Sequence, residues 1–141
     1  MKIIVPLEII MMGDVHSYHL FVKGSVNGVA CNLLVDTGAS RTVFDLSLIP
    51  EIADQKDGQP QIQSSGIYAG EIKSSFGVIR KFKMEGLKLK DWQVVLIDLS
   101  YVNETYGRFS KKRVAGLIGS DFLFRHKAIV DYKRKRLVLK Q

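Results

Sequence analysis

The sequence predicts an all-β fold, a small closed β structure that contains one or two short helices. Three observations support this prediction. Short apolar runs recur along the chain, with turn residues between them. Two of these runs flank Asn27-Gly28, and that pattern is a strong local signal for a β-hairpin. Helix-like patterns are short: one lies within residues 41–53, and another begins at Gly119-Ser120 and extends to about Lys127.

The expected elements follow one another with short polar connections. The expected strands are rich in Ile, Val, Leu and Phe. They comprise residues 2–10, 16–26, 29–36, 76–84, 92–99, 128–132 and 136–139, with a glycine-punctuated hairpin over residues 61–73. Residues 100–113 are polar and are expected to form a loop.

Length and composition indicate a single domain over residues 1–141, in which residues 1–15 form an N-terminal strand or extension. The apolar fraction of 46% is sufficient for a core, and no apolar run is long enough to span a membrane. The first twelve residues suggest a signal peptide, but Pro6 and Glu8 interrupt them and no small-residue cleavage site follows. We therefore expect an edge strand there, a cytoplasmic protein and no membrane partner, with a short anchor as the alternative.

The positive charge of the chain is concentrated near its end. Of a net charge of +7, residues 108–141 contribute eleven Lys or Arg and two acidic residues. Such asymmetry suggests an anionic partner. The alternative is a set of solvated turns, because Lys133-Arg134-Lys135-Arg136 stands between two expected strands. Aromatic residues do not alternate with the basic ones as single-stranded nucleic-acid binding requires, so we favour solvated turns and expect no nucleic-acid partner.

The stretch with the clearest chemical content is Leu33-Leu34-Val35-Asp36-Thr37-Gly38-Ala39-Ser40. An apolar strand leads directly into a carboxylate, which is costly there unless hydrogen bonds or a reaction require it. Gly38 allows a sharp turn and the close approach of another backbone. The alternative is an ordinary Asp-x-Gly turn in which Asp36 caps its own loop.

The sequence gives little indication of a catalytic cysteine or serine. The single Cys31 lies in a strand pattern, where a buried and inert thiol is the usual case. No motif places a histidine beside Ser40, so Ser40 is expected to support the loop by hydrogen bonding. His16, His19 and His126 are expected to be surface or strand residues.

A second motif lies downstream, at Ala115-Gly116-Leu117-Ile118-Gly119-Ser120-Asp121. Together, the Asp-Thr-Gly segment and this apolar-Gly motif resemble the two signatures of the single-lobed, retroviral-protease-like (retropepsin-like) aspartic proteases. The resemblance extends over about residues 17–139. It implies a closed β-barrel of the acid-protease type with one lobe per chain, and it implies an aspartic endopeptidase that needs no cofactor and no metal.

The resemblance also implies roles for the residues of the first motif. Asp36 would be the catalytic residue, and a symmetric homodimer would bring two Asp36 carboxylates together, since neither Asp121 nor Asp131 is followed by Thr-Gly. Thr37 would brace the two loops across the two-fold axis. Gly38, Ala39 and Ser40 would support the active-site loop.

Two further segments acquire expected roles in the same way. A flap that closes over a peptide substrate would have its tip at Gly66, Ile67, Tyr68, Ala69 and Gly70. The second motif would be structural: Gly116, Leu117, Ile118 and Gly119 would pass behind the Asp36 loop, and Asp121 would accept backbone amides or cap the helix. The family's terminal strands often interleave in dimers, which would place residues 2–7 and 136–140 at the interface.

Fold alone does not fix function, so the same scaffold also allows one alternative to a peptidase. A non-catalytic dimeric module could use the same scaffold to bind peptides or proteins. The intact Asp-Thr-Gly triplet favours the peptidase, because a pure binding module has no need for the acid.

Overall fold

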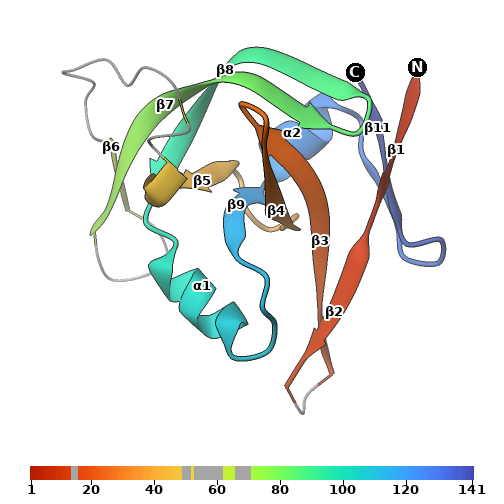
Figure 1. Ribbon diagram of the computed structural model, residues 1–141, viewed down its shortest axis with the longest axis horizontal. Helices are drawn as coiled ribbons and strands as arrows, with labels where there is room; N and C mark the ends of the chain where they lie inside the picture. The colour runs from red at the N-terminus through yellow and green to blue at the C-terminus, as the bar shows by residue number, and fades with distance from the viewer. Residues whose placement is uncertain (14–15, 49–51, 53–61, 66–70) are drawn as a thin grey trace.

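The structure is a computed structural model that describes residues 1–13, 16–48, 52, 62–65 and 71–141 (Figure 1). Within these residues the chain is mostly β-strand, with two short α-helices and one 3-10 turn. The strands are β1 (Lys2–Pro6), β2 (Glu8–Met12), β3 (Ser17–Val26), β4 (Val29–Val35), β5 (Val43–Asp45), β6 (Ile62–Ser65), β7 (Glu71–Met84), β8 (Leu87–Ile97), β9 (Val114–Ile118), β10 (Ile129–Asp131) and β11 (Arg136–Lys140). The helices are η1 (Leu46–Leu48), α1 (Ser100–Gly107) and α2 (Ser120–Arg125).

Six strands close into a barrel, which confirms the predicted fold class. Their order is β3-β4-β9-β5-β8-β7, and β7 returns to pair with β3. β2 and β6 extend the sheet beyond the barrel, and β1, β11 and β10 form a separate three-stranded sheet. None of the described helices is long and apolar enough to cross a membrane.

The barrel closes along a short seam between β3 and β7. Two residue pairs form this seam, Ser25 with Lys83 and Val26 with Phe82. Asn27 extends it from the hairpin turn, because its backbone N–H donates to the Lys81 carbonyl at 2.8 Å and its side-chain oxygen accepts from the Lys81 N–H at 3.0 Å. Asn27 adopts a left-handed φ of 50°, as the predicted Asn-Gly turn requires.

The barrel interior is filled by aromatic and aliphatic side chains. Phe44, Phe82, Trp92 and Phe122 contact one another at ring-centroid distances between 5.0 and 6.3 Å. Edge-to-face packing of this kind adds to the free energy that burial provides. A second, smaller cluster lies between the outer face of the sheet and α1, and it includes Met12, Phe21, Leu34, Leu99, Tyr106 and Val114.

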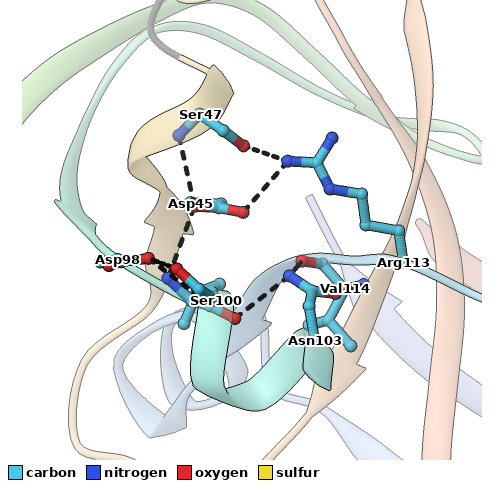
Figure 2. Close-up of polar contacts among 8 residues, drawn as sticks. Asp45, Ser47, Asp98, Ser100, Asn103, Arg113 and Val114 are labelled. Carbon is cyan, nitrogen blue, oxygen red and sulfur yellow. Dashed lines mark hydrogen bonds and ion pairs between the residues drawn. The ribbon is translucent and has the colours of Figure 1, made fainter. Parts of the chain in front are cut away.

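Helix α1 is the main correction to the sequence prediction, which expected a loop over residues 100–113. The helix has a single buried residue, Tyr106, so its own sequence shows no clear apolar stripe. Tertiary contacts hold it instead (Figure 2). The Asn103 side-chain amide donates to the Val114 carbonyl at 3.0 Å and accepts from the Val114 N–H at 2.6 Å. A side chain therefore pairs with the start of β9 as a strand would.

Smaller corrections concern strand bounds. The expected strand over residues 2–10 is two strands, β1 and β2, which belong to different sheets. β8 begins at Leu87 and not at residue 92, because it forms a long hairpin with β7 around Glu85, whose φ is 51°. The predicted hairpins β3–β4 and β10–β11 are confirmed.

The terminal strands pair with each other inside one chain. β1 and β11 are antiparallel, with Lys2 opposite Lys140 and Pro6 opposite Arg136. An interface that interleaves these strands between two chains stays a prediction. The tip of the expected flap, residues 66–70, lies outside the described residues, while β6 and β7 on either side of it pair antiparallel.

Candidate active site

The Asp36 loop begins where β4 ends. β4 lies between β3 and the parallel strand β9, so its last residues are held from both sides. The Asp36 N–H donates to the Ile118 carbonyl at 2.9 Å, which continues this pairing by one residue. The Gly38 N–H donates to Asp36 Oδ1 at 3.0 Å. The carboxylate is thus oriented by its own loop and remains half-exposed.

The second motif passes directly behind this loop. Ser120 donates its N–H to the Ala39 carbonyl at 2.7 Å. A Cβ on Gly119 would lie 2.7 Å from the Arg41 carbonyl carbon and 2.8 Å from the Ala39 oxygen, closer than real contacts allow. A Cβ on Gly116 would lie 2.8 Å from the Val43 carbonyl oxygen. Both positions therefore require glycine for close approach of the backbone.

Asp121 and Thr42 form a polar connection beneath the loop. Asp121 Oδ1 accepts from the Thr42 N–H at 2.9 Å, from the Thr42 hydroxyl at 2.7 Å and from the Phe122 N–H at 2.8 Å. Thr42 Oγ1 in turn accepts from the Gly119 N–H at 3.0 Å. Thr42 is 3% exposed. Thr42 was not assigned to the site from the sequence, because nothing in its local pattern distinguishes it from any other threonine near a turn.

An open pocket of about 450 Å³ lies beside Asp36. The residues that line it come from the Asp36 loop and from four neighbouring elements. They are Tyr18, His19, Leu20, Leu34, Val35, Asp36, Thr37, Tyr106, Val130 and Tyr132. The pocket therefore combines one carboxylate with apolar and aromatic walls. Thr37 is exposed at its rim, and so are Gly38 and Ser40 in the same loop.

Tyr106 and His19 are pocket residues that sequence reasoning did not assign to the site. Tyr106 belongs to the helix that was expected to be a loop, and His19 was expected only to be a surface or strand residue. Burial raises the pKa of the Tyr106 phenol, and the negative charge of Asp36 raises it further. His126 lies elsewhere and is buried, with its Nδ1 2.9 Å from the Lys140 carbonyl.

Two further carboxylates among the described residues, Asp45 and Asp121, have structural partners. Asp45 is buried, accepts from the Ser47 N–H at 3.2 Å and pairs with Arg113 at 3.3 Å (Figure 2). Asp121 is occupied by the bonds described above. Among the described residues, no three His, Cys, Asp or Glu side chains are grouped so that they could hold a metal ion.

We expect the Cys31 thiol to be unreactive in the folded protein. Burial raises its pKa from 9.0 to about 11, so at pH 8 its thiolate fraction is about 100-fold smaller than in the unfolded chain. Iodoacetamide should alkylate Cys31 far more slowly in buffer than in guanidinium chloride. Equal rates would contradict this.

The same pKa difference makes the stability of the fold depend on pH. The folded protein holds the Cys31 proton more tightly than the unfolded chain, so the free energy of unfolding is unaffected by this group below pH 9 and decreases as the pH rises to about 11.

The barrel, the Asp-Thr-Gly loop and the glycine crossing behind it define a single-lobed acid-protease fold. The chain belongs to the aspartyl protease family, whose sequence model matches residues 22–122. A search of curated protein sequences finds no match.

Solved structures share this fold at low sequence identity. A retropepsin-like aspartic protease from Rickettsia conorii has a TM-score of 0.60 and 19% identity, and the match covers 99% of this chain and 92% of that one. The retroviral protease-like domain of Ddi1 from Leishmania major has a TM-score of 0.55 and 18% identity, with 86% and 87% covered. EIAV protease in complex with the inhibitor HBY-793 has a TM-score of 0.51 and 16% identity, with 82% and 93% covered.

Proposed function

We propose that this protein is an aspartic endopeptidase that is active as a homodimer, with one Asp36 from each protomer. The observation that carries the proposal is the position of Asp36. Its carboxylate is half-exposed in an open pocket, on the Asp-Thr-Gly loop that the Gly119 crossing holds in place. It is the one carboxylate among the described residues that line this pocket. We therefore assign the second acid of the pair to another chain, as the resemblance to single-lobed proteases implies.

Two facing carboxylates supply both an acid and a base. Two carboxyl groups at close range cannot both ionise easily, because their negative charges repel. The pair therefore shares one proton and titrates as a unit. The ionised carboxyl group takes a proton from a water molecule, which attacks the carbonyl carbon of the peptide bond. The protonated carboxyl group donates its proton to the carbonyl oxygen. Return of a proton to the nitrogen then allows the amine to leave.

The pocket walls support a preference for apolar residues beside the scissile bond. Leu20, Leu34, Val35 and Val130 contribute aliphatic surface close to Asp36. A peptide in extended conformation places alternate side chains on opposite faces, so one of them can enter this pocket while the backbone passes Asp36. Residues 66–70 are proposed as the flap tip, by resemblance alone.

Cleavage as a function of protein concentration tests the proposal. An unfolded, carboxymethylated protein serves as the substrate between about pH 4 and 7, the range in which a shared-proton carboxyl pair is active. Activity per mole of chain should rise with concentration and then level off as the dimer forms. Activity that is independent of concentration down to the lowest measurable dilution would contradict a reversible dimer. No cleavage under any condition would favour the non-catalytic binding module.

A further inference from the structure

Three polar side chains form a connected chain at the edge of the Asp36 pocket. Ser17 and His19 lie on one face of β3 together with Phe21, because side chains alternate along a strand. In the β3–β4 register Leu20 is opposite Val35, so His19 is level with Asp36. Helix α1 covers this face and brings Tyr106 to His19.

The geometry of this chain is well defined. Ser17 Oγ lies 2.8 Å from His19 Nε2, and Tyr106 Oη lies 2.8 Å from His19 Nδ1. The His19 and Tyr106 rings meet edge to face, with centroids 5.2 Å apart. The Phe21 ring also meets the Tyr106 ring edge to face, with centroids 5.6 Å apart, and Tyr106 is only 9% exposed. Packing therefore fixes the position of the hydroxyl group in the pocket wall.

Counting donors shows that the protonation state of His19 controls the two hydroxyl groups. A neutral imidazole has one N–H and accepts one hydrogen bond, so one hydroxyl donates to the ring and the other keeps its hydrogen free. An imidazolium has two N–H groups and donates to both oxygens. The Ser17 and Tyr106 hydroxyl hydrogens are then both free to point elsewhere. When neutral His19 carries its hydrogen on Nε2, Tyr106 donates to Nδ1, and protonation of His19 releases the Tyr106 O–H donor. In the other tautomer the Tyr106 hydrogen is free in both protonation states.

The released donor has a limited set of acceptors in the pocket. The titratable side chains that line the pocket with His19 are Asp36, Tyr18, Tyr106 and Tyr132. On the neighbouring strand β2, the residue opposite His19 is Ile10, which carries no charge. The remaining walls are aliphatic apart from Thr37. A buried polar donor in such surroundings favours a ligand that brings an oxygen acceptor.

We propose that the Ser17–His19–Tyr106 chain is a specificity element. In it, neutral His19 carries its hydrogen on Nε2, and protonation of His19 frees the Tyr106 hydroxyl to donate to a side-chain carbonyl oxygen of the bound peptide. The inference rests on the proposed peptidase function and identifies a class of substrate for it. Peptides with glutamine or glutamate next to the apolar pair are preferred, and the preference increases as the pH falls. Tyr106 acts as a binding residue and His19 as a positioning residue.

The experiment uses pairs of peptides based on a site cut in the unfolded test protein. The peptides differ in one residue beside the scissile pair, glutamine or methionine, which have similar length but differ in the oxygen acceptor. Both compete in the same reaction at pH 5 and at pH 7.5, and their product ratio gives the ratio of kcat/KM. We expect glutamine to be favoured about five-fold at pH 5 and less at pH 7.5.

Tyr106→Phe removes the hydroxyl and retains the ring. It should bring the ratio to about one at both pH values while the methionine peptide is still cut. Tyr101→Phe is the matched control in the same helix, because Tyr101 is 80% exposed, and it should leave the ratio unchanged. Thermal unfolding of each variant verifies that it folds.

Three outcomes of the glutamine–methionine competition would overturn the inference. They are a ratio near one in the wild type at both pH values, a Tyr106→Phe variant that keeps the preference, or a Tyr106→Phe variant that slows both peptides equally, as expected if Tyr106 donates to Asp36. A glutamate peptide that is preferred when glutamine is not would also overturn it, since the charge of His19 would then be responsible.

A binding measurement separates this inference from the proposed function. The same two peptides are made with the scissile peptide bond reduced to an amine, so that they cannot be cleaved. Each is titrated into the wild-type protein at both pH values. A glutamine preference in binding, without any cleavage of the normal peptides, would refute the peptidase and retain the specificity element. Cleavage of both peptides at equal rates would retain the peptidase and refute the element. Failure of both reduced peptides to bind would refute the element as well.

Discussion

Asp36→Asn is expected to lower the rate of peptide cleavage by roughly 10²- to 10⁴-fold, the range that general acid–base groups contribute. An asparagine side chain neither takes a proton from water nor shares one with a partner carboxylate. The fold should be retained, because the asparagine side-chain oxygen can still accept the Gly38 N–H that now bonds to Asp36 Oδ1. Initial rates at a concentration where the dimer is formed measure the effect.

Asp91→Asn is a suitable control for this substitution. Asp91 is an exposed carboxylate whose side chain is 67% accessible, and it lies on β8 outside the pocket. Its replacement makes the same chemical change and should leave the rate unaltered. An Asp36→Asn protein that cleaves at the wild-type rate would refute the proposed mechanism, and thermal unfolding would show whether a loss of activity has a structural cause.

Gly119→Ala is expected to have the largest effect on stability, a decrease of about 3 kcal/mol in the free energy of unfolding. The added Cβ would meet backbone atoms of Ala39 and Arg41 at 2.7 to 2.8 Å. Backbone atoms cannot rotate away as a side chain can, so the Asp36 loop and the start of α2 must separate. Urea denaturation measures the change, and the residual folded protein should also cleave more slowly.

Gly107→Ala provides the matched comparison. Gly107 is the last residue of α1, and a Cβ at this position would have nothing within 4 Å. The same methyl group should therefore change the free energy of unfolding by no more than about 1 kcal/mol, in either direction. If the two variants unfold at the same urea concentration, the glycine crossing at Gly119 is not the constraint described here.

The parts of the fold that were predicted from the sequence have either a local cause or a family motif. The Asn27-Gly28 turn needs left-handed backbone conformations, and the residues themselves supply them. From the family resemblance, Gly119 of the second motif was expected to permit a close crossing, and a Cβ there would lie 2.7 to 2.8 Å from backbone atoms of Ala39 and Arg41. The turn can therefore be read from its own residues. The crossing was expected only from the resemblance, because the backbone atoms that require glycine there belong to a distant segment.

Features that depend on distant contacts could not be predicted in this way. Helix α1 has little amphipathic pattern, and it is held by Asn103 on the start of β9 and by the burial of Tyr106. Thr42 contributes through Asp121, which is 79 residues away in the sequence. The contact between His19 and Tyr106 spans 87 residues. The position of Asp36 on its loop was predicted, and the composition of the pocket around it was not.

The short seam between β3 and β7 has a consequence for the dynamics of the barrel. Local opening of a protein begins where the fewest backbone hydrogen bonds must break together. β7 and β8 pair over nine residue pairs, whereas β3 and β7 share two, supported by Asn27. Amide hydrogens on the β3–β7 side should therefore exchange with solvent earlier than those between β7 and β8. Such opening would separate β7 from β3, while the β7–β8 hairpin stays attached to the barrel through the three residue pairs of β8 with β5.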